Sequence, residues 1–64
     1  MFDGEDNQYR VWVYYRMGPG ILDIGLPSGL FSEQGAQEFA VMAGSKHNVT
    51  RVEVVLAKKY GRDV

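Results

Sequence analysis

Hydrophobic side chains recur at every second position in three stretches of the chain. Residues 9–17 are rich in Val, Tyr and Trp, residues 21–26 alternate Leu and Ile with other residues, and residues 49–58 alternate Val and Leu with Arg and Glu. A period of two is the period of a β-strand, and β-branched and aromatic side chains favour strands. The pattern therefore predicts three strands.

A different spacing separates the second stretch from the third. Small and aromatic side chains recur there at the positions i, i+3, i+4 and i+7 of one helical stripe: Ala36, Phe39, Ala40 and Ala43. Ser32 is a favoured N-cap residue just before the stripe, and Gly44 is a typical helix end just after it. The spacing predicts a helix over residues 33–43.

Glycine and proline mark the connections between these elements. Residues 18–20, Gly-Pro-Gly, predict a tight turn that joins the first two strands into a hairpin, and residues 27–29, Pro-Ser-Gly, are expected to end the second strand. The helix returns the chain to the start of the third strand. That strand pairs either in parallel with the second strand or antiparallel with the first.

We favour the antiparallel arrangement, because the first strand is the most apolar and aromatic and suits a central position. The expected fold is α+β with the order β-β-α-β: a three-stranded antiparallel sheet, strand order 2-1-3, with one helix packed on one face. A single domain would span residues 9–58, between a flexible acidic leader (1–8) and a flexible tail (59–64). Its expected core is Val11, Val13, Tyr15, Met17, Leu22, Ile24, Leu26, Ala36, Phe39, Ala40, Val52, Val54 and Leu56.

Composition narrows the classes of function. The chain has 64 residues, of which 45% are hydrophobic, and its net charge is −1. It contains no cysteine and one histidine, so a disulfide or a thiolate metal site is excluded and His47 alone cannot build a zinc site. No hydrophobic run reaches the roughly 18 residues of a membrane span. We expect a cytoplasmic protein that is not an enzyme and binds no metal or cofactor.

One face of the predicted sheet carries an unusual set of side chains. In the first strand, Arg10, Trp12, Tyr14 and Arg16 alternate with the core positions, so they point away from the helix. Arg51 and Glu53 of the third strand are expected to join them. Trp, Tyr and Arg are enriched at the hot spots of protein interfaces. The prediction is a partner-binding surface made by these six residues.

Two other functions use the same features. Aromatic and arginine side chains on a sheet can stack the bases of single-stranded nucleic acid, although the net charge is negative and Glu53 lies on the same face. A structural homodimer would also cover the face. The edges of the sheet are further candidate contacts, because an edge strand can accept a strand from a partner.

The third strand also carries a short motif, Val49-Thr50-Arg51-Val52. Together with Val11-Trp12 in the first strand, the length and the β-β-α-β order, it resembles the RNA-polymerase inhibitor family of T7-like phages. The resemblance implies a phage-encoded protein that binds a host protein, such as RNA polymerase or another nucleic-acid-processing enzyme, with Arg51 among its contacts. Glu53 stands where the family has a second basic residue.

Overall fold

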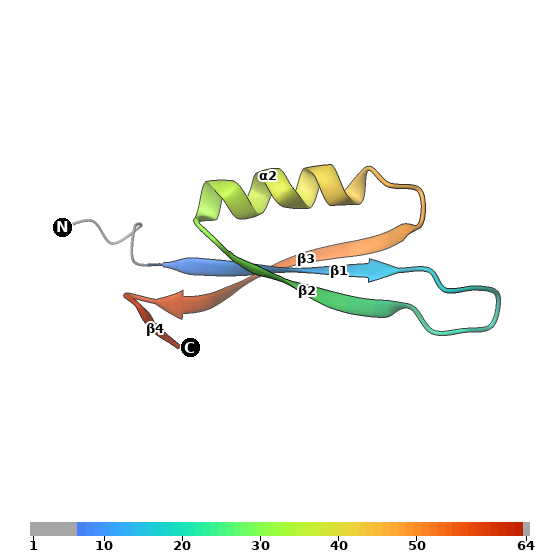
Figure 1. Ribbon diagram of the computed structural model, residues 1–64, viewed down its shortest axis with the longest axis horizontal. Coiled ribbons are helices and arrows are strands. Elements are labelled where there is room, and N and C mark those ends of the chain that lie inside the picture. The colour runs from blue at the N-terminus through green and yellow to red at the C-terminus, as the bar shows by residue number, and fades with distance from the viewer. Residues whose placement is uncertain (1–6, 64) are drawn as a thin grey trace.

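An antiparallel sheet with one helix on one face makes up the structure, a computed structural model that describes residues 7–63 (Figure 1). The elements follow the chain in this order: β1 (Gln8–Tyr15), β2 (Ile24–Phe31), α2 (Glu33–Gly44), β3 (Val49–Lys59) and β4 (Arg62–Asp63). The strand order is β2-β1-β3-β4. The α+β class, the antiparallel pairing and the central position of β1 are confirmed. Most of the predicted leader, residues 1–6, lies outside the described residues.

The predicted number of strands is wrong, because the chain forms a fourth strand where a flexible tail was expected. Lys58 and Lys59 of β3 pair with Asp63 and Arg62 of β4. The two turn residues, Tyr60 and Gly61, both have positive φ angles, 55° and 78°. Two such residues form the tight turns whose twist suits a β-hairpin.

The first hairpin is longer than predicted. β1 ends at Tyr15 and β2 begins at Ile24, so residues 16–23 form the connection, and β2 continues through residues 27–29 to Phe31. Proline is compatible with this strand because β2 lies at the edge of the sheet. The register shifts between Arg10 and Trp12, and there the Ser28 Oγ accepts a hydrogen bond of 3.0 Å from the Val11 N–H. The Ser28 hydroxyl thus satisfies a backbone donor at the irregularity.

The helix lies close to the sheet because its inner positions are small. Ser32 is the N-cap, as predicted, and its Oγ accepts the Gly35 N–H at 3.2 Å. Ala36 and Ala43 are buried against Val11 and Val13 of β1, and these four residues are the fully buried core. Seven partly buried side chains surround them: Tyr9, Tyr15, Phe31, Phe39, Ala40, Val49 and Val52.

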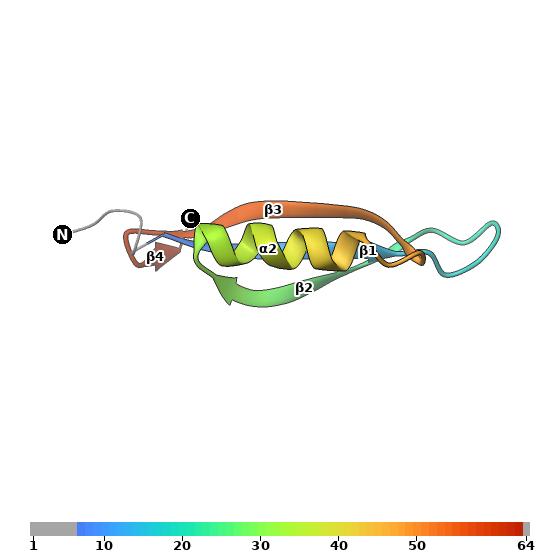
Figure 2. The same ribbon diagram turned by 90° about the horizontal axis from the view of Figure 1, so that it is seen from above.

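Five predicted core residues are exposed instead: Met17, Leu22, Ile24, Leu26 and Val54. The helix lies over β1, with β3 on one side of it and β2 on the other, as Figure 2 shows from above, and it packs less against β2 than against the other two strands. Ile24 and Leu26 therefore lie beside the helix and not beneath it. Met17 and Leu22 belong to the connection that extends past the helix, and Leu22 is 88% exposed. Within residues 7–63, no helix has the length and hydrophobicity needed to cross a membrane.

Candidate functional site

The face of the sheet opposite the helix, called here the open face, carries the even-numbered side chains of β1. Val11 and Val13 point to the helix, so Arg10, Trp12 and Tyr14 point the other way. The register places Val55, Glu53 and Arg51 of β3 opposite these three residues, in that order. On the other side, β2 contributes Leu30, Pro27 and Gly25.

Five of the six predicted site residues are therefore brought together, and Arg16 is not. Arg16 lies past the end of β1, its side chain is exposed, and its backbone N–H donates to the Asn48 carbonyl oxygen at 2.8 Å. The strand was predicted to continue to Met17, and this extension placed Arg16 on the face by alternation. The observed contact fixes the backbone of Arg16 beside the start of β3 instead.

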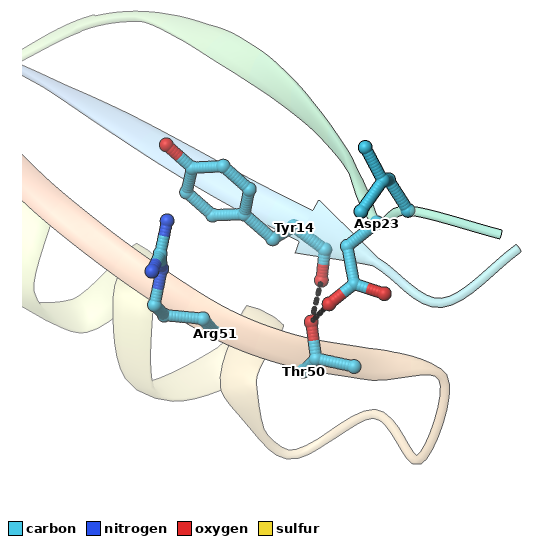
Figure 3. A pocket seen from close by; sticks show the side chains of 5 residues that line it. Tyr14, Asp23, Thr50 and Arg51 are labelled. Carbon is cyan, nitrogen blue, oxygen red and sulfur yellow. Dashed lines mark hydrogen bonds between the residues drawn. The ribbon is translucent and has the colours of Figure 1, made fainter. Parts of the chain in front are cut away.

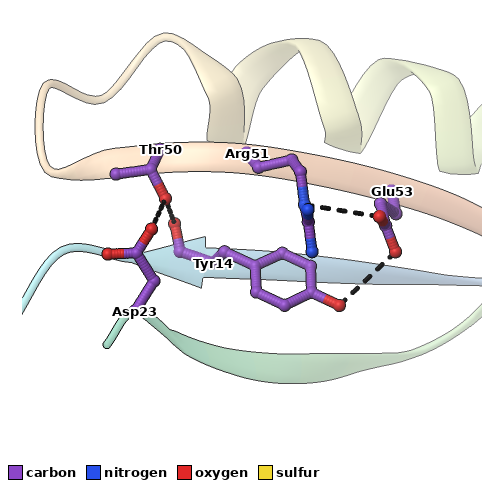
Figure 4. Close-up of polar contacts among 5 residues, drawn as sticks. All are labelled: Tyr14, Asp23, Thr50, Arg51 and Glu53. Carbon is purple, nitrogen blue, oxygen red and sulfur yellow. Dashed lines mark hydrogen bonds and ion pairs between the residues drawn. The ribbon is translucent and has the colours of Figure 1, made fainter.

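Tyr14, Arg51 and Glu53 form a connected cluster on the open face (Figure 4). The Arg51 guanidinium carbon lies 4.2 Å from the centroid of the Tyr14 ring, within the range of a cation–π contact. The Arg51 Nε lies 3.3 Å from Glu53 Oε2, and the Tyr14 hydroxyl donates to Glu53 Oε1 at 3.4 Å. Each of the three side chains contacts the other two at the surface of the sheet.

Gly25 completes the environment of the Tyr14 ring from the other side. A Cβ atom at position 25 would lie 2.5 Å from the Tyr14 Cε2 atom, so the ring lies directly over the glycine backbone. An aromatic ring over a glycine in the neighbouring strand compensates for the missing side chain. No local sequence signal points to Gly25, because only the strand register brings it under the Tyr14 ring.

Replacing Gly25 with alanine is expected to destabilise the domain by about 1–3 kcal/mol, because the added methyl group must displace the Tyr14 ring. Gly29→Ala is the matched control, since a Cβ atom at position 29 has no other atom within 4 Å. Thermal unfolding of both variants measures the difference. Equal melting temperatures for the two variants would show that the ring does not rest on Gly25.

Thr50 is a second residue of the site that was not predicted from the sequence. The β1–β3 register shifts between Tyr14 and Tyr15, so Thr50 is an extra residue in β3. Its hydroxyl oxygen lies 2.6 Å from Asp23 Oδ2 and 3.3 Å from the Tyr14 carbonyl oxygen. A hydroxyl donates one hydrogen, and the shorter distance favours Asp23. Through this hydrogen bond, Thr50 attaches residues 16–23, which link β1 to β2, to the end of the sheet.

Beside Thr50 and Asp23, the open face ends in a shallow depression of about 400 Å³ (Figure 3). Its lining combines an aromatic ring, an apolar side chain, a hydroxyl and two opposite charges: Tyr14, Leu22, Thr50, Asp23 and Arg51. Such a mixed lining suits the side chains of a protein partner. His47 does not belong to this lining and lies exposed in the loop before β3.

Trp12 occupies the middle of the open face. It lies between Pro27 of β2 and Glu53 of β3 in the register, and it is partly buried although no helix covers it. Beside it, the Arg10 Nη1 donates to the Ser28 carbonyl oxygen at 3.1 Å, which fixes the guanidinium over β2. Trp12 therefore has a cationic side chain on either side: Arg10 in β1 and Arg51 in β3.

Comparison with known proteins identifies no family for this chain. No protein-family model, curated protein or solved structure matches the chain. In residues 7–63 no three His, Cys, Asp or Glu side chains converge on a possible metal position. The open face is therefore the feature of the described residues from which we infer a function.

Proposed function

We propose that the protein is a small non-enzymatic protein-binding module that covers part of a larger partner with its open face. The observation that carries the proposal is the position of Trp12. This large aromatic side chain is at the centre of a face that the helix leaves uncovered, beside the ordered Tyr14–Arg51–Glu53 cluster. Interface hot spots have this composition and this central placement.

The order of the face supports binding. Arg51 is held by Tyr14 and Glu53, and Arg10 is held by the Ser28 carbonyl group. Binding costs conformational entropy when flexible side chains are immobilised at the interface. Because these arginines are already positioned, less of that cost arises when the partner arrives.

The contacts of the face favour a protein over single-stranded nucleic acid. The Tyr14 ring lies over Gly25 and against Arg51, so residues of the chain itself occupy the surface on which a base would stack. Arg51 is paired with Glu53, which lowers the positive charge offered to a phosphate. Nucleic-acid affinity depends on such cations and on accessible aromatic rings.

The partner we propose is a host protein, with the chain acting as a phage-encoded inhibitor or modulator. The support for this partner is the resemblance of the run Val49-Thr50-Arg51-Val52 to the phage inhibitor family, and the candidates are RNA polymerase or another nucleic-acid-processing enzyme of the host. Arg51 lies at the border of the depression, where its guanidinium group can meet a carboxylate of the partner.

Affinity capture tests this function against the nucleic-acid alternative. Tagged protein is incubated with nuclease-treated bacterial lysate at low and at high salt, and binding of single-stranded oligonucleotides is measured under the same conditions. We expect one or a few proteins to be retained at both salt concentrations, because a contact centred on an aromatic side chain depends little on salt. Oligonucleotide binding that falls steeply with salt, together with no retained protein, would contradict the proposal.

A further inference from the structure

The two long edges of the sheet differ in how well they are protected. Along β2, Pro27 cannot donate to an added strand, and the irregularity at Ser28 interrupts the edge. Edge strands are commonly blocked by such features, which prevent pairing with other chains. This edge is thus unsuited to strand addition.

The outer edge of β3 is less protected, because its two irregular positions, Thr50 and Ala57, lie near the ends of the strand. β4 pairs only with Lys58 and Lys59, so within residues 7–63 no strand lies beside residues 49–57 on that side (Figure 2). This stretch contains neither proline nor glycine. Between the two irregular positions, residues 51–56 form a regular edge of six residues whose backbone can accept an added strand.

We infer that the β3 edge is a homodimer interface, at which β3 of a second copy pairs antiparallel with β3 about a two-fold axis at Val52. In this register Arg51 of each copy lies opposite Glu53 of the other, on the open face. A shift by two residues in either direction would place Arg51 opposite Arg51 or Glu53 opposite Glu53. Opposite charges stabilise a cross-strand pair and like charges destabilise it, so the charge pattern of β3 selects this register.

Exposed hydrophobic side chains along the same edge support a second copy as the occupant. Val54 points to the helix side of the sheet, opposite Val11, yet it is 40% exposed because no strand lies beyond it. On the open face, Val55 lies opposite Arg10 and is 39% exposed at the same edge. A two-fold axis perpendicular to the sheet keeps both helices on the same face of the joined sheet.

The dimer goes beyond the proposed binding function, because it joins two open faces into one surface. Both copies present Trp12 on the same side of a continuous sheet. Each partner-binding event could then be bivalent, which raises the apparent affinity for a repeated or dimeric target. The fully buried core of one copy is small, and pairing at β3 would extend it across the two-fold axis.

Sedimentation velocity on the full chain tests the interface through two charge reversals. The parent chain is expected to sediment as a dimer. Arg51→Glu and Glu53→Arg should each weaken dimerisation by about tenfold or more, because a two-fold dimer contains the Arg51–Glu53 pair twice. An equimolar mixture of the two variants should dimerise again, since every cross-strand pair is then of opposite charge.

The mixture distinguishes a loss of dimerisation from a loss of folding. Within each variant chain, residues 51 and 53 carry like charges, so only pairing between the two different chains can restore the dimer. Glu38→Arg is the matched control for charge and should dimerise like the parent, as Glu38 is exposed on the outer surface of α2. Val54→Lys tests the edge without touching the charged cluster and should give a monomer, whereas Leu22→Lys, in the distant connection, should not. A parent chain that stays monomeric, a mixture that stays monomeric, or a Val54→Lys variant that dimerises like the parent would overturn the inference.

Discussion

Replacing Phe39 with alanine is expected to destabilise the domain by about 3 kcal/mol, at the lower end of the range for a buried aromatic side chain. The Phe39 ring stacks on Phe31 with a centroid distance of 5.1 Å and packs against the four-residue core. It is partly buried, which reduces the loss. Chemical denaturation followed by circular dichroism measures the change in the free energy of unfolding.

The size of the core makes this loss large in relative terms. Single domains are stable by about 5–15 kcal/mol, and small ones lie near the lower limit. Phe39 also packs α2 against Phe31 of the edge strand β2, and the helix covers little of the rest of that strand. Much of the folded population should therefore be lost at elevated temperature.

Val41→Ala is the control for this prediction, because Val41 belongs to the same helix and is largely exposed. Its stability should change by only a few tenths of a kcal/mol. If the two variants unfold at the same denaturant concentration, the stacked pair of Phe31 and Phe39 does not hold the helix on the sheet.

The sequence predicted the elements that depend on local chemistry. The stripe of small residues in the helix, the Ser32 cap and the alternation of β1 all have a fixed period or a fixed position relative to the helix end. The open face follows directly, because the alternation of Val11 and Val13 with Trp12 and Tyr14 determines which side chains share a side of the sheet.

Features that depend on tertiary structure were predicted less well. Pro27 and Gly29 signal a strand end, but Pro27 fits an edge strand and the Ser28 side chain supports the irregular backbone. The exposure of Leu26 depends on how far the helix reaches across the sheet, which local spacing does not encode. Gly25 and Thr50 contribute to the site only through the strand register, so no local signal identified them.

The prediction that bears most on function is a loss of binding by Trp12→Ala. We expect the affinity for the captured partner to fall by about 2 kcal/mol or more, which corresponds to about 30-fold or more in Kd. An aromatic hot-spot residue contributes mainly when it is desolvated by the partner. The fold should persist, because Trp12 lies on the uncovered face and its cross-strand contacts are worth about 0.2–1 kcal/mol each.

Arg51→Ala should have a smaller effect on equilibrium affinity and a larger effect on the association rate if its charge meets the rim of the partner. This variant also removes the contact on the Tyr14 ring and the ion pair with Glu53, so its thermal melt is measured in parallel. A slower association with an unchanged dissociation rate would assign Arg51 to steering, and a faster dissociation would assign it to the centre of the contact.

Gln37→Ala provides the control for Trp12→Ala, because Gln37 is exposed on the helix, on the other side of the sheet. Its partner recovery and its melting temperature should equal those of the parent. If Trp12→Ala and Gln37→Ala recover the partner equally from lysate, the open face is not the working surface. The contact would then lie at a strand edge or on the exposed apolar connection between β1 and β2, because both leave backbone or hydrophobic groups uncovered.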